Sequence, residues 1–159
     1  MVEDRQEAGH WEGDTIVSGK RTHGKAALAV TQERTTRLIT ATLIPNLKPE
    51  SFTAATNAMF AGKLVRTLSL DNGIENKQHQ GITDATGAQV FFCDPYSSYQ
   101  KGGVEHANKM LRRYLPKGCD LGRFTQAQVD DFVATINRKP RRCLGYKSAL
   151  QLAEEKGII

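Results

Sequence analysis

Three acidic residues have the types and the spacing of metal-binding carboxylates: Asp14, Asp71 and Glu105. Asp14 interrupts a short apolar segment, Asp71 ends a second apolar segment directly before Asn-Gly, and Glu105 lies in the first turns of a predicted helix. A charge on a buried strand needs a partner or a metal. Two strand-borne aspartates and one helix-borne glutamate can therefore converge on two divalent cations, which together promote in-line attack on a phosphodiester.

Each of these acids also has an ordinary interpretation. The chain holds 17 Asp and Glu in total, and a single acid is most often a solvated surface charge. Glu105 fits a surface ladder of ion pairs with Lys101 and Lys109 equally well, since the three are four residues apart on a helix. Glu12 shares a strand face with Asp14, which suits either an acid that supports the site or a surface salt bridge.

Length and charge limit the class of protein. At 159 residues the chain predicts a single domain, 1–159. A net charge of +5 favours a polyanionic partner such as DNA, and the basic residues thicken after residue 100; a solubilising surface is the alternative. Three cysteines without CxxC spacing argue against zinc. With no signal-peptide core and no run near the roughly 18 apolar residues of a membrane span, we expect a cytoplasmic protein without membrane contact.

The elements that must position the acids are read from hydrophobic patterning. Strands are predicted at 11–17, 25–31 and 37–44, and their short links favour an antiparallel meander. A helix from Pro49 to Gly62, a strand at 65–70, a polar helix at 75–86 and a strand at 89–93 follow. This order predicts an α/β fold with a mixed five-stranded sheet, three antiparallel strands then two parallel ones, flanked by helices.

Three further helices are predicted toward the C-terminus, at 102–115, from Thr125 onward, and at 148–156. Gln128 completes a capping box with Thr125. The helix at 102–115 has an apolar stripe that we expect in the core, formed by Val104, Ala107, Leu111 and Tyr114. Its other face carries polar residues: Lys101, Glu105, Asn108, Lys109 and Arg112.

A series of short motifs runs in a fixed order from residue 9 to residue 152. They are Gly9-His10-Trp11-Glu12-Gly13-Asp14, Leu70-Asp71-Asn72-Gly73 with Glu75, Asp94-Pro95-Tyr96-Ser97, Gln100-Lys101-Gly102 with Glu105 and Asn108, residues 111–118, and Asn137-Arg138-Lys139-Pro140-Arg141 with Leu144-Gly145-Tyr146. In this order and spacing the chain resembles the ribonuclease-H-like catalytic (integrase core) domains of retroviral integrases and DDE transposases. It resembles most closely the bacterial insertion-sequence transposases of the IS-thirty family.

The resemblance implies a function and a set of residues. Asp14, Asp71 and Glu105 would be the catalytic triad that binds two Mg²⁺ or Mn²⁺ ions, with Asp14 shared between them. The activity would be DNA strand cleavage and transfer, the partners would be mobile-element ends and target DNA, and the chain would form a homodimer associated with the bacterial nucleoid. Contacts with DNA are expected from Asn72, Lys101, Asn108, Lys109, Arg112, Arg138 and Arg141. Tyr96 and Tyr99 would either stack on an unpaired base or pack within their loop.

The chain departs from the family pattern at a few positions around the triad. Asn76 stands where the family has an aromatic residue, Ser98-Tyr99 where it often has Pro-Trp, and Val104 and His106 where it often has asparagines. The chain also begins just before the first predicted strand, so we expect a fragment or degenerate copy without the family's N-terminal helix-turn-helix region. Two other functions stay open: a ribonuclease-H-type nuclease that only hydrolyses, and an inactive DNA-binding or dimerisation fragment.

Overall fold

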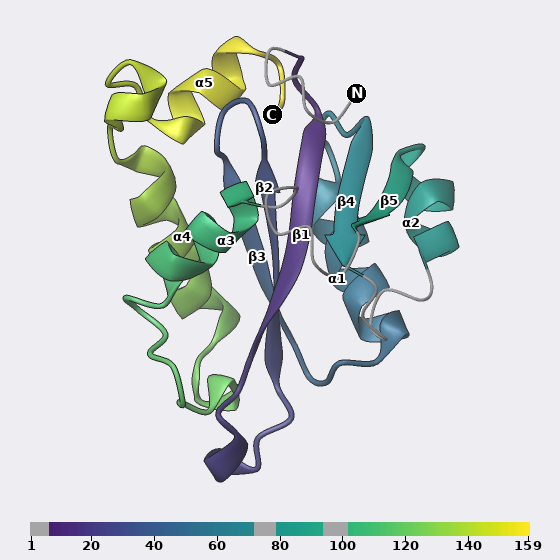
Figure 1. Ribbon diagram of the computed structural model, residues 1–159, viewed down its shortest axis with the longest axis vertical. Helices are drawn as coiled ribbons and strands as arrows, with labels where there is room; N and C mark the ends of the chain where they lie inside the picture. The colour runs from purple at the N-terminus through teal and green to yellow at the C-terminus, as the bar shows by residue number, and fades with distance from the viewer. Residues whose placement is uncertain (1–6, 72–78, 94–101) are drawn as a thin grey trace.

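A five-stranded mixed sheet forms the centre of the molecule. The computed structural model describes residues 7–71, 79–93 and 102–159. The strands are β1 (His10–Val17), β2 (Ala27–Glu33), β3 (Ile39–Ile44), β4 (Thr67–Asp71) and β5 (Gln89–Cys93), in the spatial order β3-β2-β1-β4-β5 (Figure 1). β1, β2 and β3 pair antiparallel, whereas β4 is parallel to both β1 and β5. The predicted fold class and strand arrangement are confirmed.

Helices cover both faces of this sheet. They are α1 (Pro49–Phe60), α2 (His79–Thr86), α3 (Gly102–Leu111), α4 (Gln126–Arg138) and α5 (Ala149–Glu155), with short 3₁₀ helices η1 (Lys20–Thr22), η4 (Leu121–Arg123) and η5 (Arg142–Leu144). In Figure 1, α3 and α4 lie in front of the sheet and α1 behind it. No helix in the described part of the chain is long and apolar enough to cross a membrane.

Two apolar cores result, because successive strand side chains point to opposite faces. One core lies between the sheet and α1, where Trp11 packs on Phe60 with ring centroids 5.1 Å apart and donates from its indole Nε1 to the Leu64 carbonyl at 3.0 Å. The other core lies under α3 and α4 and includes the predicted stripe residues Val104, Ala107 and Leu111. The alternation places Glu12 and Asp14 of β1 on the α3 side of the sheet.

The predicted bounds of β2, β3 and α3 differ from the observed ones. β2 continues to Glu33 because the ladder with β1 extends to the pair Trp11↔Glu33. β3 starts only at Ile39, since Arg37 has a left-handed φ of 66° that breaks the strand. α3 ends at Leu111 rather than at 115. Leu115 directly precedes Pro116, and a residue before proline is disfavoured in a helix.

The remaining boundaries agree with the predictions to within two residues where they are described. α1 begins at Pro49, and the capping box of Thr125 with Gln128 is present at the start of α4. α5 begins after Ser148, which caps it. The described part of α2 begins at His79, and the predicted residues 75–78 lie outside the described residues.

Candidate metal and DNA site

The carboxylate of Asp14 is held from two sides. Asp14 lies on β1 and is half-buried. Its Oδ1 accepts a hydrogen bond from the Thr15 backbone N–H at 2.8 Å, and its Oδ2 accepts one from Asn108 Nδ2 of α3 at 3.1 Å. The second contact joins residues 94 positions apart in the chain. It fixes the carboxylate against the exposed face of α3.

Glu105 lies on the same face of α3, one turn before Asn108. Its side chain is exposed, and no ion pair joins it to Lys109 within the described residues. Lys101, the other partner of the predicted ladder, lies outside those residues. Glu105 lies on the turn of α3 between Val104, which contacts Glu12, and Asn108, which contacts Asp14, and so this turn runs along the part of β1 that carries both acids.

Asp71 is the last residue of β4, the strand that pairs in parallel with β1. The described register ends at Glu12↔Ser69, and Asp14 and Asp71 each follow that pair by two residues. Neighbouring strands are about 4.8 Å apart. The backbone of Asp71 is described but its side chain is not, and the described side chains include no cluster of three or more metal-ligating residues. The joint binding of metal by the triad thus stays a prediction.

Glu12 anchors the N-terminus of α3. Its side chain is buried, with 1% of the residue exposed. Oε2 accepts a hydrogen bond from the Val104 backbone N–H at 2.9 Å, and Oε1 lies 3.3 Å from the Arg34 guanidinium, which is also buried. A negative charge at this end also complements the helix dipole. The surface salt bridge considered for Glu12 is wrong, because both members of the pair are buried.

Gly103 allows this close approach. A Cβ atom at this position would lie 3.0 Å from Glu12 Oε2 and 3.1 Å from Gln32 Oε1. The start of α3 therefore rests directly on polar side chains of β1 and β2.

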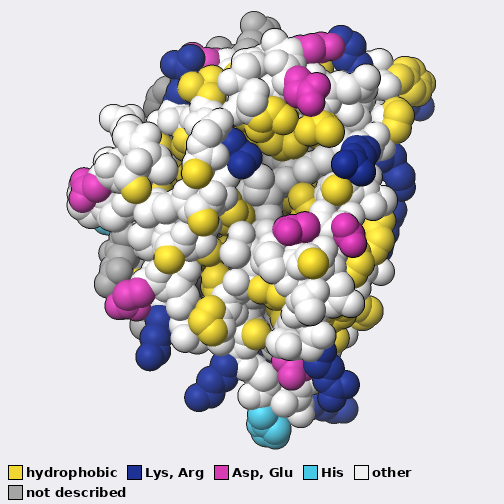
Figure 2. Space-filling model, turned by 180° about the vertical axis from the view of Figure 1, so that it is seen from behind, with side chains coloured by type: hydrophobic (Ala, Val, Ile, Leu, Met, Phe, Trp, Pro, Cys, Tyr) yellow, Lys and Arg dark blue, Asp and Glu magenta, His cyan; other side chains and the backbone are white. Residues whose placement is uncertain are grey.

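Positive charge gathers on the exposed side of α3. We call Arg37, Lys109, Arg113 and Arg141 the basic cluster, because all four lower the pKa of His106. Partial burial is the largest cause of that shift, followed by the charge of Arg141 and then of Arg37. The cluster brings together the β2–β3 turn, α3 and the segment after α4. By contrast, the face behind the sheet has acidic and basic side chains interspersed (Figure 2).

The predicted DNA contacts are placed unevenly. Lys109 and Arg138 are exposed, and Arg141 is half-buried. Arg112 uses its guanidinium within the protein, where it donates to the carbonyls of Leu115 at 3.3 Å and Val17 at 3.4 Å. The other predicted contacts lie outside the described residues: Asn72, Lys101, Tyr96 and Tyr99.

Two arginines at this site were missed from the sequence. Arg34 pairs with Glu12 and Arg37 joins the basic cluster, but Arg34 falls in the link between two predicted strands and Arg37 at the predicted start of the second, 37–44. The signal that was available is the lone acid Glu12 on a buried strand, which requires a cationic partner somewhere in the fold.

Solved structures share this fold. The structure matches the catalytic core domain of the BIV integrase with a TM-score of 0.73 and 20% identity, over 94% of this chain and 95% of that one. It matches a chain of the simian T-cell lymphotropic virus intasome with a TM-score of 0.72 and 18% identity, over 91% of this chain and 54% of that one. The protein has the α/β fold of an integrase catalytic core.

Sequence relatives narrow the class. The chain is 39% identical over 158 residues to the transposase for insertion sequence element IS1086 of Cupriavidus metallidurans. It is 31% identical over 159 residues to the transposase InsI for element IS30A of Escherichia coli, and 33% identical over 153 residues to a probable transposase for IS1161 of Streptococcus salivarius. No protein-family model matches.

These matches cover 95 to 96% of this chain but only 40 to 44% of each relative, so the chain spans less than half the length of the transposases it matches. Over nearly its whole length the protein is a homologue of the IS30-type insertion-sequence transposases. The predicted resemblance is confirmed.

Proposed function

We propose that this chain is the catalytic domain of a DDE transposase, which cuts DNA strands at the ends of a mobile element and joins them to target DNA. The observation that carries the proposal is the contact of Asn108 with Asp14. Asn108 lies one helical turn from Glu105, and Asp14 lies on β1, the strand beside β4, which ends in Asp71. Homology to transposases over nearly the whole chain supports the same activity. In this proposal residues 1–159 form one domain, which acts as a homodimer on the DNA of the bacterial nucleoid.

The donor set suits Mg²⁺ or Mn²⁺. Hard cations prefer carboxylate and amide oxygens, and the three acids offer only such atoms. Asn108 Oδ1 is buried and has no hydrogen-bond partner among the residues that the structure describes, although Nδ2 of the same side chain bonds to Asp14. An unsatisfied acceptor beside a carboxylate fits a site that orders a water molecule. Two ions held by Asp14, Asp71 and Glu105 would supply activation of the attacking oxygen and stabilisation of the leaving oxygen.

The residues around the acids have separate roles in this proposal. Asn108 orients the Asp14 carboxylate, while Glu12 and Arg34 fix α3 and thereby the position of Glu105. The basic cluster attracts the DNA phosphates and holds the strand along α3. Lys109, one turn after Glu105, is the cation on α3 best placed to contact the phosphate next to the cut.

The test is Mn²⁺-dependent nicking of DNA by the chain and its variants. Asp14→Asn, Asp71→Asn and Glu105→Gln should each abolish nicking, because each removes a negatively charged ligand with little change in shape. Asp131→Asn on α4, an exposed acid far from the candidate site in sequence, should nick like the parent chain. Nicking that persists unchanged in Asp71→Asn would refute the triad.

A second assay separates the transposase from a nuclease that only hydrolyses. The chain is given a DNA duplex with a pre-cut 3′ end together with a labelled target. A transposase joins the 3′-hydroxyl to the target and gives a longer labelled strand, whereas a nuclease gives shortened products only.

A further inference from the structure

Tyr146 is an aromatic side chain held outward on a tight turn. It is 70% exposed, and its backbone has a left-handed φ of 66°. Gly145 before it has a similar φ of 64°. Residues with a Cβ atom adopt this conformation rarely, whereas glycine adopts it freely. A bulky aromatic residue in such a position is a strained feature that the surrounding structure has to maintain.

The turn around Tyr146 is fixed by hydrogen bonds at both ends. Arg141 and Lys147 form a β-bridge, in which the Arg141 N–H donates to the Lys147 carbonyl at 3.0 Å. The backbone N–H groups of Tyr146 and Leu144 both donate to the Arg141 carbonyl, at 2.9 and 3.0 Å. Lys147 is tied in turn to Glu155 of α5 by bonds of 2.9 and 3.0 Å. Strain that a rigid frame maintains at an exposed residue points to function.

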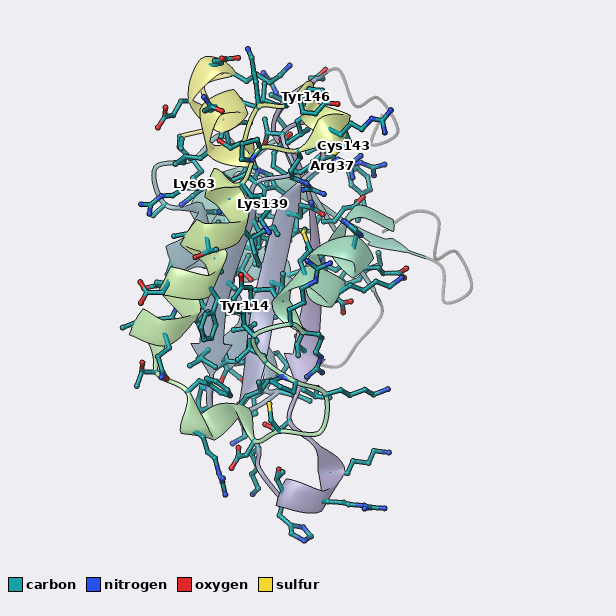
Figure 3. All side chains as sticks on the ribbon, turned by 90° about the vertical axis from the view of Figure 1, so that its left-hand side faces the viewer. Arg37, Lys63, Tyr114, Lys139, Cys143 and Tyr146 are labelled. Carbon is teal, nitrogen blue, oxygen red and sulfur yellow. The ribbon has the colours of Figure 1, made fainter. Side chains whose placement is uncertain are left out.

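The charge around this turn is positive. Arg142 is exposed, and the Nη1 atom of Arg141 is buried with no hydrogen-bond partner in the described part of the chain. Figure 3 shows Tyr146, Cys143 and Arg37 at the same end of the molecule. The turn that holds Tyr146 thus carries exposed positive charge at Arg142.

We infer that Tyr146 is a stacking platform for an unpaired base of DNA, with Arg141 and Arg142 binding the phosphates on either side of it. Any base can stack on an aromatic ring, and the planar guanidinium group matches a phosphate with paired hydrogen bonds. A rigid turn holds the ring ready, so little ordering is needed on binding. The inference deepens the proposed function and rests on it for one point, that the partner is DNA.

The test compares two DNA molecules without divalent metal, so that no cleavage occurs. One is a blunt duplex, and the other is the same duplex with an unpaired 3′ overhang that contains the fluorescent base 2-aminopurine. Stacking on Tyr146 quenches that fluorescence. We expect Tyr146→Gly to bind the overhang DNA about 5- to 150-fold more weakly than the parent chain does and to bind the blunt duplex equally well. Tyr146→Phe and Tyr146→Trp should keep the preference for the overhang DNA over the blunt duplex.

The glycine variant also separates binding from folding. Glycine relieves the left-handed backbone, so the melting temperature of Tyr146→Gly should be equal to or higher than that of the parent chain. Arg142→Gln should weaken DNA binding, and the magnitude of the slope of the logarithm of the binding constant against the logarithm of the salt concentration should fall by about 1. The matched control Arg21→Gln removes the same charge from η1, which lies at the opposite end of the molecule from α5 in Figure 1, and should leave the overhang preference intact.

The inference is overturned if Tyr146→Gly binds the overhang as tightly as the parent chain, or if it weakens both DNA molecules equally. It is also overturned if the parent chain quenches no fluorescence. Quenching by Tyr146 together with absence of Mn²⁺-dependent nicking would contradict the proposed function alone, and nicking without quenching would contradict this inference alone.

Discussion

Asn108 of α3 reaches across to β1 and donates a hydrogen bond from Nδ2 to Oδ2 of Asp14 at 3.1 Å. The Oδ1 atom of the same side chain is buried, and none of the described residues bonds to it. One residue therefore both orients the first acid of the predicted triad and offers an acceptor beside it. Glu105 stands one turn earlier on the same helix, which makes α3 the element that links two of the three acids.

Asn108→Ala should lower Mn²⁺-dependent nicking by about 10- to 100-fold, the usual effect of losing a residue that orients a metal ligand. A higher Mn²⁺ concentration should partly restore the nicking rate, because the Asp14 carboxylate remains. Nicking rates measured across a Mn²⁺ titration give both values. Asn57→Ala on α1 removes the same group from the other face of the sheet, and there the rate should not change. Equal rates for Asn108→Ala and the parent chain would contradict the assigned role.

Replacing only one member of the buried pair of Glu12 and Arg34 should destabilise the protein strongly. Glu12→Gln leaves the Arg34 guanidinium buried without a counter-charge, and we expect a loss of about 3–5 kcal/mol in the free energy of unfolding. Arg34→Met should cost a similar amount. The double variant should cost clearly less than the sum, because no uncompensated charge is left. Urea unfolding of the four proteins measures this coupling, and additive losses would show that the two side chains do not act as a pair.

Gly103→Ala should destabilise the protein although it lies in a helix. In a helix position with free space around it, replacing glycine by alanine raises the free energy of unfolding by about 1 kcal/mol. Here the new methyl group would lie 3.0 Å from Glu12 Oε2 and 3.1 Å from Gln32 Oε1, both on buried side chains. Either the helix start or these two buried side chains must therefore shift, and we expect the cost of that shift to exceed the gain. Thermal unfolding decides the sign, and a higher melting temperature would show that the helix start has room to spare.

Two amides of α4 cover the open edge of β3. Asn137 Oδ1 accepts from the Ile39 N–H at 3.0 Å, and its Nδ2 donates to the Ile39 carbonyl at 2.9 Å. In the same way, Gln126 Oε1 accepts a hydrogen bond from the Leu43 N–H at 2.8 Å, and its Nε2 donates to the Ala41 carbonyl at 3.1 Å. Together they take the place of a neighbouring strand along an edge that would otherwise invite pairing with another chain.

Removing these amides should therefore have two effects. Asn137→Ala should lower the free energy of unfolding by about 1–3 kcal/mol, since it leaves a buried N–H and C=O unpaired, and Gln126→Ala should cost less because Gln126 is only half-buried. Sedimentation should also show more self-association in the double variant. Gln80→Ala, on the exposed surface of α2, is the matched control and should change neither measurement. A stable, unassociated double variant would show that α4 does not protect the edge.

The fold was accessible from the sequence because most elements carry their own signals. The strand at Gln89–Cys93 and the capping box of Thr125 with Gln128 are local patterns, and both are confirmed. The boundary errors have a distant cause in β2 and a local cause in β3. β2 gains residues through its ladder with β1, and β3 loses residues because the Arg37 backbone turns left-handed.

The candidate site was predicted only as a set of residue types. The contact between Asn108 and Asp14 and the pairing of Glu12 with Arg34 depend on how α3 docks on β1, which no local pattern encodes. Periodicity did place Glu105 and Asn108 on one face of a helix, and that part could be anticipated. Binding of metal by the three acids together, and the contacts with DNA, stay predictions.

Diffraction from crystals soaked in Mn²⁺, with the anomalous signal of the metal recorded, would test the central claim most directly. We predict anomalous density beside Asp14 and within ligand distance of Asp71 and Glu105, and its loss in Asp71→Asn crystals soaked in the same way. Manganese bound only elsewhere on the protein, or a position that none of these three carboxylates reaches, would contradict the account.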